Sequence, residues 1–248
     1  MSRPIEPGAD LTRVAREVFG WPQLRPAQLQ AMEAVLAGRD VLAVMATGSG
    51  KSAIYRVPGV LLEGATLVIS PLIALQHDQI SGLSATAAPD AVAINSLLDS
   101  DETGRAWAAL RDRAAEYVFL APEQLTNDAV IAALTDLAVS LVVVDEAHCV
   151  SAWGHDFRPD YLRVGDAINK LGHPTVVALT ATASPPVRRE IIDQLGLRDP
   201  LVIASGFDRP NITLEVFYCI TDDDKRDAVL AAALAADRPA LLYTATRK

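Results

Sequence analysis

The chain has 248 residues, of which 50% are hydrophobic and 21% charged, so it can build a large core and is not a disordered segment. Its 22 Lys and Arg residues against 31 Asp and Glu residues leave a net charge of −9, which argues against nucleic-acid binding by bulk positive charge but allows a local stacking groove. Two cysteines are too few for a disulfide scaffold or a zinc site. The N-terminus lacks the apolar run of a signal peptide and no segment is apolar enough to span a membrane, so we expect a cytoplasmic protein.

Two helices are predicted before the first strand. In the first, the apolar residues between Leu11 and Val18 share one face, and Gly20 can end the helix. The second is expected at about Pro26–Gly38. From residue 41 onwards, apolar β-branched runs alternate with helical patterns, and several runs are continuously apolar, as in parallel strands covered on both faces. The predicted strands are Val41–Met45, Thr66–Ser70, Ala91–Ile94, Tyr117–Leu120, Leu141–Val144, Thr175–Leu179 and Leu201–Ala204.

This alternation of strands and helices predicts an α/β fold with a doubly wound parallel sheet. Among the connecting helices, one is expected at Asp101–Ala115, capped by Ser100, and another at Pro185–Leu195, capped by Ser184. No internal repeat interrupts the pattern.

A new unit is expected after residue 205. Ser205–Asn211 contains Gly and Pro and is interpreted as a linker. An extended run at 212–220, a helix at 222–236 and a strand at 240–243 are expected to follow it. We therefore predict a first domain at residues 1–205 and, at residues 206–248, a linker with the truncated beginning of a second domain.

Residues 45–52 read MATGSGKS and connect a predicted strand to the next helix. Glycines in such a loop let backbone N–H groups converge on phosphates, and the helix N-terminus adds a favourable field. Lys51 is expected to meet the β- and γ-phosphates, and the Ser52 hydroxyl to bind Mg²⁺. A strict phosphate loop has Gly where Met45 stands, so the match is to the GxGKS core; a Gly-rich turn with a surface lysine is the other interpretation. The predicted ATP-binding residues here are Thr47, Gly48, Ser49, Gly50, Lys51 and Ser52.

The sequence Asp145-Glu146-Ala147-His148 follows an apolar run. An acid at the end of a buried strand is placed to hold Mg²⁺ opposite the phosphate loop, and we assign this to Asp145, through water. Glu146 is expected to orient or deprotonate the attacking water. An acidic strand end that caps the next helix is the competing interpretation. The predicted catalytic residues are Lys51, Asp145, Glu146 and His148.

With these two motifs placed, the order of the remaining motifs resembles a superfamily 2 helicase and, within it, the RecQ family of DNA helicases, from Phe19 to the end of the chain. Residues 19–28, FGWPQLRPAQ, look like that family's adenine-recognition motif. In it Gln28 can offer a bidentate amide to adenine, and Trp21 or Arg25 can lie against the ring. An amphipathic helix with an outward Gln would give the same pattern.

Two more segments look like the family's strand-contacting motifs. The first is VISPLIAL with the following Asp-Gln pair, and from it Ser70, Pro71 and Gln79 are predicted to bind DNA. The second is APEQL, at residues 121–125. Both lie at strand-to-helix turns, where backbone amides can bind DNA phosphates, although ordinary strand ends would look similar. His77 and Gln124 stand where the family pattern has Lys and Arg.

Residues 149–161, CVSAWGHDFRPDY, look like the aromatic-rich loop of RecQ helicases, with Ala152 in place of a Gln. Three aromatic residues, the last of them Tyr161, fall within nine positions, and bases stack on such rings without sequence reading. Aromatic rings that fill a gap in the core are the alternative. The predicted DNA-binding residues of this loop are Trp153, His155, Phe157 and Arg158.

Thr180-Ala181-Thr182 follows a predicted strand. It resembles the helicase motif that couples the state of the bound nucleotide to the binding of the DNA strand. The hydroxyls of Thr180 and Thr182 are placed to reach the acid motif through His148, or to act as local caps. Residues 207–211, FDRPN, resemble the passage into the second motor domain, and residues 243–247 its first strand.

The resemblance implies a RecA-like fold, with the start of a second RecA-like domain, and the cofactors ATP and Mg²⁺. It implies an ATP-dependent 3′-to-5′ helicase that acts on single-stranded or partial-duplex DNA in recombination and repair, in the cytoplasm and at the nucleoid if the source is bacterial. Without most of the second motor domain, the chain is expected to be weakly active or inactive alone. The alternatives are a truncated ATP- and DNA-binding module without turnover, and an RNA helicase of the same superfamily.

Overall fold

A computed structural model describes residues 7–151, 158–204, 212–213, 215–236 and 241–243 of the chain. The chain folds as two compact units, residues 1–207 and 208–248. This division falls close to the one predicted after residue 205. No helix in the described ranges is both long and apolar enough to cross a membrane.

The first unit contains a seven-stranded sheet in the order β3-β4-β2-β5-β6-β1-β7, and every neighbouring pair is parallel. Each predicted strand is present, with ends that differ by at most two residues. All residues of β1 and β2 are buried, which explains why all of them except Thr66 are apolar. The strands are β1 (Val41–Val44), β2 (Ala65–Ile69), β3 (Asp90–Ile94), β4 (Ala115–Leu120), β5 (Val139–Val144), β6 (Thr175–Thr180) and β7 (Leu201–Ala204).

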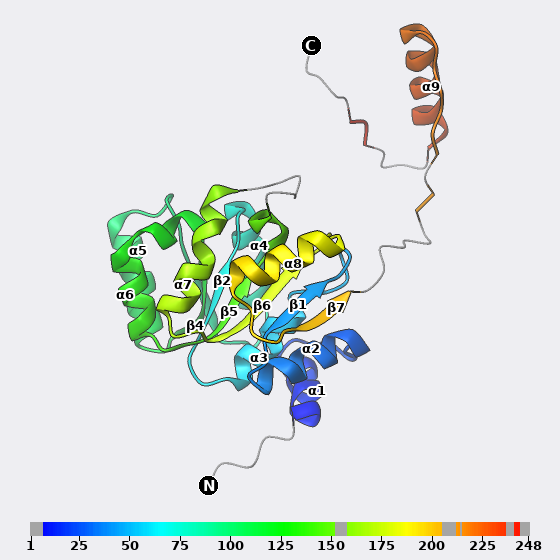
Figure 1. Ribbon diagram of the computed structural model, residues 1–248. Coiled ribbons are helices and arrows are strands. Elements are labelled where there is room, and N and C mark those ends of the chain that lie inside the picture. Colours follow the sequence, from blue (N-terminus) through cyan, green and yellow to red (C-terminus); the bar gives the residue numbers. More distant parts are fainter. Residues whose placement is uncertain (1–6, 152–157, 205–211, 214, 237–240, 244–248) are drawn as a thin grey trace. The chain divides into compact units, whose positions relative to one another are not determined.

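Helices cover both faces of this sheet (Figure 1). One core layer contains side chains of α5 (Ser100–Arg111), α6 (Asp128–Asp136), α7 (Val164–Lys170) and α8 (Pro185–Leu195). The other contains side chains of α1 (Pro7–Glu17), α2 (Pro26–Leu36), α3 (Ala53–Leu61) and α4 (Ile73–Ser84). Alternate residues of each strand point into opposite layers: Leu42 and Val44 belong to the first, and Val41 and Ala43 to the second. The sheet is thus doubly wound, as predicted.

The start and end of α5 differ from the prediction. Asp99, not Ser100, caps the helix: its carboxylate accepts the Glu102 N–H at 2.7 Å, while the Glu102 side chain accepts the Asp99 N–H at 3.1 Å. This reciprocal pair of hydrogen bonds is a capping box, and it places the N-cap of the helix one residue before the predicted cap at Ser100. The helix ends at Arg111, because Arg113 adopts a left-handed conformation with φ 55° and Ala115 already begins β4.

The second unit contains α9 (Asp222–Ala235), which confirms the predicted helix. Thr221 caps it, accepting the Asp224 N–H at 3.1 Å. No residue of α9 is buried. Residues 241–243, the described part of the expected strand at 240–243, are not in a strand. The FDRPN segment at 207–211 lies outside the described residues, so the beginning of a second RecA-like domain stays a prediction.

Candidate functional site

Several of the predicted motifs lie at the carboxyl edge of the sheet because their strands are neighbours there. β6 lies between β1 and β5, so the phosphate loop, Thr180 and the acid motif leave the sheet side by side. The Met45 N–H donates to the Thr180 carbonyl at 3.0 Å, and the Asp145 N–H donates to the Ile69 carbonyl at 2.9 Å. Ligands of doubly wound sheets bind at this edge.

The conformation of the phosphate loop at residues 45–52 depends on its glycines. Gly48 and Gly50 have φ values of 76° and 79°, in the left-handed region that favours glycine. A Cβ at Gly50 would lie 2.6 Å from Nε2 of Gln28, so the Gln28 side chain would have to move; the positive φ of Gly50 is what favours glycine there. The Lys51 ammonium donates to the Met45 carbonyl at 3.0 Å, and the buried Ser49 hydroxyl has no hydrogen-bond partner among the described residues. Both are polar groups that a phosphate can satisfy.

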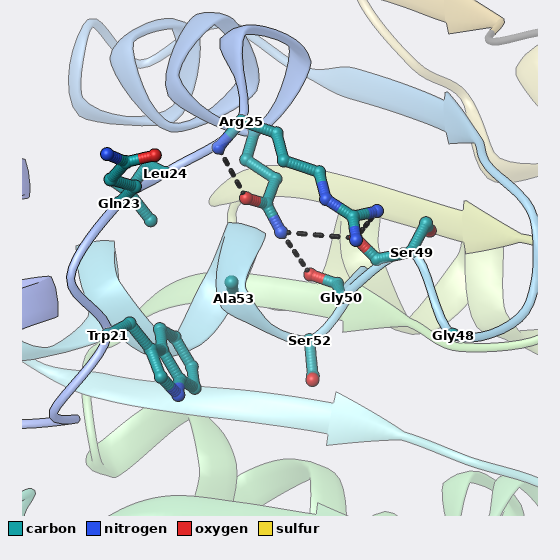
Figure 2. Close-up of a pocket in the computed structure, with 10 residues that line it drawn as sticks. Trp21, Gln23, Leu24, Arg25, Gly48, Ser49, Gly50, Ser52 and Ala53 are labelled. Carbon is teal, nitrogen blue, oxygen red and sulfur yellow. Dashed lines mark hydrogen bonds between the residues drawn. The ribbon is translucent and has the colours of Figure 1, made fainter.

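A pocket of about 280 Å³ lies between this loop and the segment that leads into α2 (Figure 2). Phe19 and Trp21 stack with their ring centroids 4.7 Å apart and an interplanar angle of 19°, which fixes the indole beside the pocket. An apolar ring face at the pocket suits a base. The lining residues are Trp21, Gln23, Leu24, Arg25, Gln28, Gly48, Ser49, Gly50, Ser52 and Ala53.

The Gln28 side chain differs from the expectation. Its Nε2 donates to the carbonyls of Ser49 and Gly50, at 3.3 and 2.9 Å, and its Oε1 accepts the Arg25 N–H at 2.8 Å. The Arg25 guanidinium also donates to the Ser49 carbonyl, at 2.9 Å. Gln28 is only 6% exposed. In this arrangement Gln28 binds the phosphate loop, and a bidentate contact with adenine would require its amide to leave these partners; the contact stays a prediction.

The two acidic residues after β5 have different environments. Asp145 is 8% exposed, and its burial together with the neighbouring Glu146 charge raises the pKa of its carboxyl. Glu146 is left-handed, with φ 49° and ψ 44°, a conformation that costs a non-glycine residue about 1 kcal/mol or more. Its carboxylate lies 3.2 Å from Nδ1 of His148, and that hydrogen bond lowers the pKa of Glu146. Glu146 is therefore the readily ionised acid of the pair.

His148 connects the acid motif to the end of β6. Its Nδ1 lies 2.9 Å from Oγ1 of Thr180 as well as near Glu146, and Cys149 and Glu146 raise its pKa to about 10. The Thr180 hydroxyl donates to the Thr182 carbonyl at 3.1 Å, so toward the imidazolium it acts as the acceptor. The expected contact between Thr180 and the acid motif is present. Thr182 contributes only backbone groups, its carbonyl and its N–H, to the hydrogen bonds with Thr180.

The residues at this edge fit magnesium held together with a nucleotide. Within the described ranges, no group of three or more His, Cys, Asp or Glu side chains could hold a metal by itself. The oxygen donors are the Asp145 carboxylate and the Ser52 hydroxyl, and Mg²⁺ is characteristically bound by one or two carboxylates plus phosphates and water. This donor set is incomplete without phosphates.

The three residues of the first strand-contacting motif that were predicted to bind DNA have different environments. Ser70 is fully buried, and its hydroxyl has no partner in the described part of the chain. Pro71 accepts a hydrogen bond at its carbonyl from Nη1 of Arg158, at 3.3 Å. Gln79 turns toward the nucleotide edge, where its amide contacts Asp145. In this structure the Ser70 side chain is buried and the Gln79 amide has a partner within the protein, and the predicted contacts of these residues with DNA stay predictions.

Only part of the aromatic-rich loop falls within the described ranges. Trp153, His155 and Phe157 lie outside the described residues, and their predicted role stays a prediction. Tyr161 is fully buried in the core layer of α5–α8, and its hydroxyl donates to the Asp145 carbonyl at 2.9 Å. The interpretation of Tyr161 as a stacking ring is wrong, because after Arg158 the chain forms a 3-10 helix, η3 (Pro159–Arg163), in which Tyr161 is the one buried residue.

The sequence model of the family described as "DEAD/DEAH box helicase" matches residues 25–190, from the adenine motif through the acid motif to α8. The chain belongs to the DEAD/DEAH box helicase family. The phosphate loop, the acid motif and Thr180–Thr182 all lie inside the matched range.

Relatives within this helicase family carry RecQ-type names. The chain is 37% identical over 238 residues to "Probable ATP-dependent DNA helicase RecS" of Bacillus subtilis (strain 168), covering 96% of this chain and 48% of RecS. It is 40% identical over 199 residues to "ATP-dependent DNA helicase RecQ" of Pasteurella multocida (strain Pm70), covering 80% of this chain and 31% of that RecQ. The resemblance to RecQ helicases is thus confirmed, and the chain spans less than half of the length of these relatives.

Solved helicase structures confirm the RecA-like fold. The helicase domain of Pyrococcus furiosus Hef superimposes with a TM-score of 0.59 over 76% of this chain and 39% of that one, at 22% identity. At this identity the likeness concerns the fold alone.

Sequence reasoning missed two residues of this helicase site and gave a third, Tyr161, a different role. Tyr55 and Arg56 on α3 contact Gln79, and Tyr161 binds the main chain of Asp145. Tyr55 and Tyr161 are fully buried or nearly so, and Arg56 is 8% exposed. A charged residue near the start of α3, amid apolar residues, was the available signal, because buried arginines require partners.

Proposed function

We propose that the chain is the first motor domain, with the segment that follows it, of an ATP-dependent DNA helicase of RecQ type that moves 3′ to 5′ along single-stranded DNA. The observation that carries the proposal is the bridge formed by His148 between Glu146 and Thr180, at the sheet edge that also bears the phosphate loop. Relatives at 37% and 40% identity bear the names of RecQ-type DNA helicases.

In the proposed reaction, the phosphate loop and Lys51 bind the β- and γ-phosphates of ATP. Asp145 and Ser52 would hold Mg²⁺, which would neutralise charge on the phosphates when bound. Glu146, whose pKa is lowered, is ionised at neutral pH and can orient the attacking water or accept its proton. The indole of Trp21 supports the base.

We propose that the loop after the acid motif transmits the binding of DNA to the nucleotide-binding edge of the sheet. Arg158 ties the end of this loop to the Pro71 carbonyl, at the turn between β2 and α4. The hydrogen bond from His148 to Thr180 ties the acid motif to the end of β6. We place the protein in recombination and repair, in the cytoplasm and at the nucleoid if the source is bacterial.

The test compares ATP binding and hydrolysis in the presence of single-stranded DNA, duplex DNA and RNA. Lys51→Ala is expected to lose ATP binding and turnover, because it deletes the phosphate counter-charge, while Glu146→Gln keeps binding and loses hydrolysis. Hydrolysis should be measured in a protein that includes both motor domains, because a cationic finger on the γ-phosphate contributes about 10³–10⁵ in rate and the RecQ resemblance implies that the second motor domain supplies it.

Stimulation by RNA instead of DNA would favour an RNA helicase. Binding of ATP and DNA without any turnover in the two-domain protein would favour a binding module. If Glu146→Gln binds ATP as poorly as Lys51→Ala, the assigned division of roles between the two residues is wrong.

A further inference from the structure

We propose that Gln79 is a positioning residue that holds the Asp145 carboxylate in the orientation in which it binds the magnesium ion of the nucleotide. The inference rests on the proposed function, because it takes Asp145 as the magnesium-binding carboxylate. It gives helix α4 a role at the nucleotide edge, whereas the sequence motif suggested that Gln79 contacts DNA.

Three contacts converge on Gln79 from elements far apart in the sequence. Its Nε2 donates to Oδ2 of Asp145 at 3.3 Å, and its Oε1 accepts the hydroxyl of Tyr55. Its main-chain carbonyl accepts Nη2 of Arg56 at 3.0 Å. Tyr55 and Arg56 are adjacent on α3, the helix that the phosphate loop opens, and Asp145 follows β5. Gln79 therefore joins the phosphate-loop helix to the acid motif.

The chemistry of these partners fixes the direction of the Gln79 amide. An ionised carboxylate only accepts hydrogen bonds, so the NH₂ group must face Asp145 and the carbonyl oxygen must face Tyr55. Burial raises the pKa of Tyr55 to about 12, so the hydroxyl keeps its proton and donates it. The tyrosine holds the amide in the one orientation that serves the carboxylate.

Both oxygens of Asp145 are held in this way. Oδ1 accepts the Glu146 N–H at 3.0 Å, and Oδ2 accepts the Gln79 amide. Because each oxygen has two lone pairs, Oδ2 can keep the amide and still accept a metal-bound water. A carboxylate that is already held in this orientation binds a divalent cation without first rotating.

Gln76, on the preceding turn of α4, shows that a buried glutamine here need not serve the nucleotide edge. It is fully buried, and its Nε2 donates to the Ser70 carbonyl at 2.9 Å. Its Oε1 lies 3.5 Å from Nδ2 of Asn95. These contacts connect α4 to the ends of β2 and β3, so Gln76 contacts the sheet and Gln79 contacts the acid motif.

The test measures how much magnesium the chain needs to bind a fluorescent ATP analogue. Gln79→Leu keeps most of the side-chain bulk and removes both hydrogen bonds. We expect the Mg²⁺ concentration for half-maximal binding to rise about tenfold, the lower end of the effect of losing a partner of a metal ligand. Binding without magnesium should not change, because the phosphate loop is intact. Tyr55→Phe should give a smaller shift, and no additional shift when combined with Gln79→Leu.

Gln76→Leu is the matched control: it deletes a buried amide from the same helix, and the magnesium requirement should stay at the wild-type value. Thermal unfolding establishes that folded variants are compared, and if Gln79→Leu does not fold, Tyr55→Phe decides. A wild-type magnesium requirement in Gln79→Leu, or an equal shift in Gln76→Leu, would overturn the positioning role. Failure of the wild-type chain to bind the analogue with magnesium would instead overturn the proposed function, and this inference with it.

Discussion

Replacing Thr180 by Val tests the bridge between the acid motif and β6. The substitution keeps the branched shape at a fully buried strand end and removes only the hydroxyl. That hydroxyl accepts from His148 at 2.9 Å, donates to the Thr182 carbonyl at 3.1 Å and accepts the Thr182 N–H at 3.3 Å. The perturbation is therefore confined to one hydrogen-bonding group at the centre of the proposed coupling path.

The expected magnitude follows from the charge on His148. A hydrogen bond to a charged group contributes about 1.5–3 kcal/mol. If the bond is formed when DNA is bound and hydrolysis occurs, its loss slows DNA-stimulated hydrolysis by roughly 10- to 100-fold. ATP affinity should be unchanged, because the hydrogen bonds of the Thr180 hydroxyl go to His148 and Thr182 and not to the phosphate loop. Thr182→Val should have a smaller effect, because Thr182 bonds to Thr180 through its backbone.

The assay is single-turnover hydrolysis in the two-domain protein, with and without single-stranded DNA, together with titration of a fluorescent ATP analogue. His148→Gln, alone and combined with Thr180→Val, completes a double-mutant cycle. The reasoning is refuted if Thr180→Val is stimulated by DNA as strongly as the wild type. Additive effects of the two substitutions would also refute it, because residues that act through one bond are not additive.

Three further predictions concern stability and DNA sensing. Asp40 is 4% exposed, and its carboxylate accepts the N–H groups of Val176 and Arg198 at 2.8 and 2.7 Å. Asp40→Ala should therefore lower the free energy of unfolding, measured by urea titration, by about 2–5 kcal/mol, while ATP binding is retained. Asp40→Asn should lower it by less. The pKa of His148 is raised from 6.5 to about 10 on folding, so its contribution to stability is complete below pH 6.5 and is lost as the pH rises toward about 10; urea titrations across this range should show a decline that His148→Gln flattens. Trp153→Ala and Phe157→Ala should leave ATP binding unchanged and reduce stimulation of hydrolysis by single-stranded DNA, and equal stimulation would mean that these rings only pack.

The sheet and the position of the nucleotide edge were predictable because they depend on local patterns. Continuous apolar runs such as Leu141–Val144 mark strands buried on both faces, and the phosphate loop is recognised from adjacent residues. The strand order was not predicted, since it depends on contacts between distant segments. That order is what brings Thr180 between the phosphate loop and Asp145.

The direction of individual polar side chains was less predictable. Gln28, Gln79 and Tyr161 each belong to a motif whose spacing indicates a ligand, yet each binds the protein's own backbone or a neighbouring side chain. A glutamine can satisfy a buried carboxylate or carbonyl as well as it can bind DNA or adenine, so residue type and spacing do not choose between these partners. Only the packing of α2, α4 and η3 decides.

The contact between Gln28 and the phosphate loop has a consequence for how a nucleotide first binds. In a trans peptide the C=O and the following N–H point in opposite directions. Because the Gln28 amide holds the Ser49 and Gly50 carbonyls on one side, the N–H groups of Gly50 and Lys51 face the other way. Those amides are thus pre-organised for an anion before any ligand arrives, which reduces the ordering entropy lost on binding. Gln28, which was expected to contact the adenine base, thus fixes the conformation of the loop that is expected to bind the phosphates.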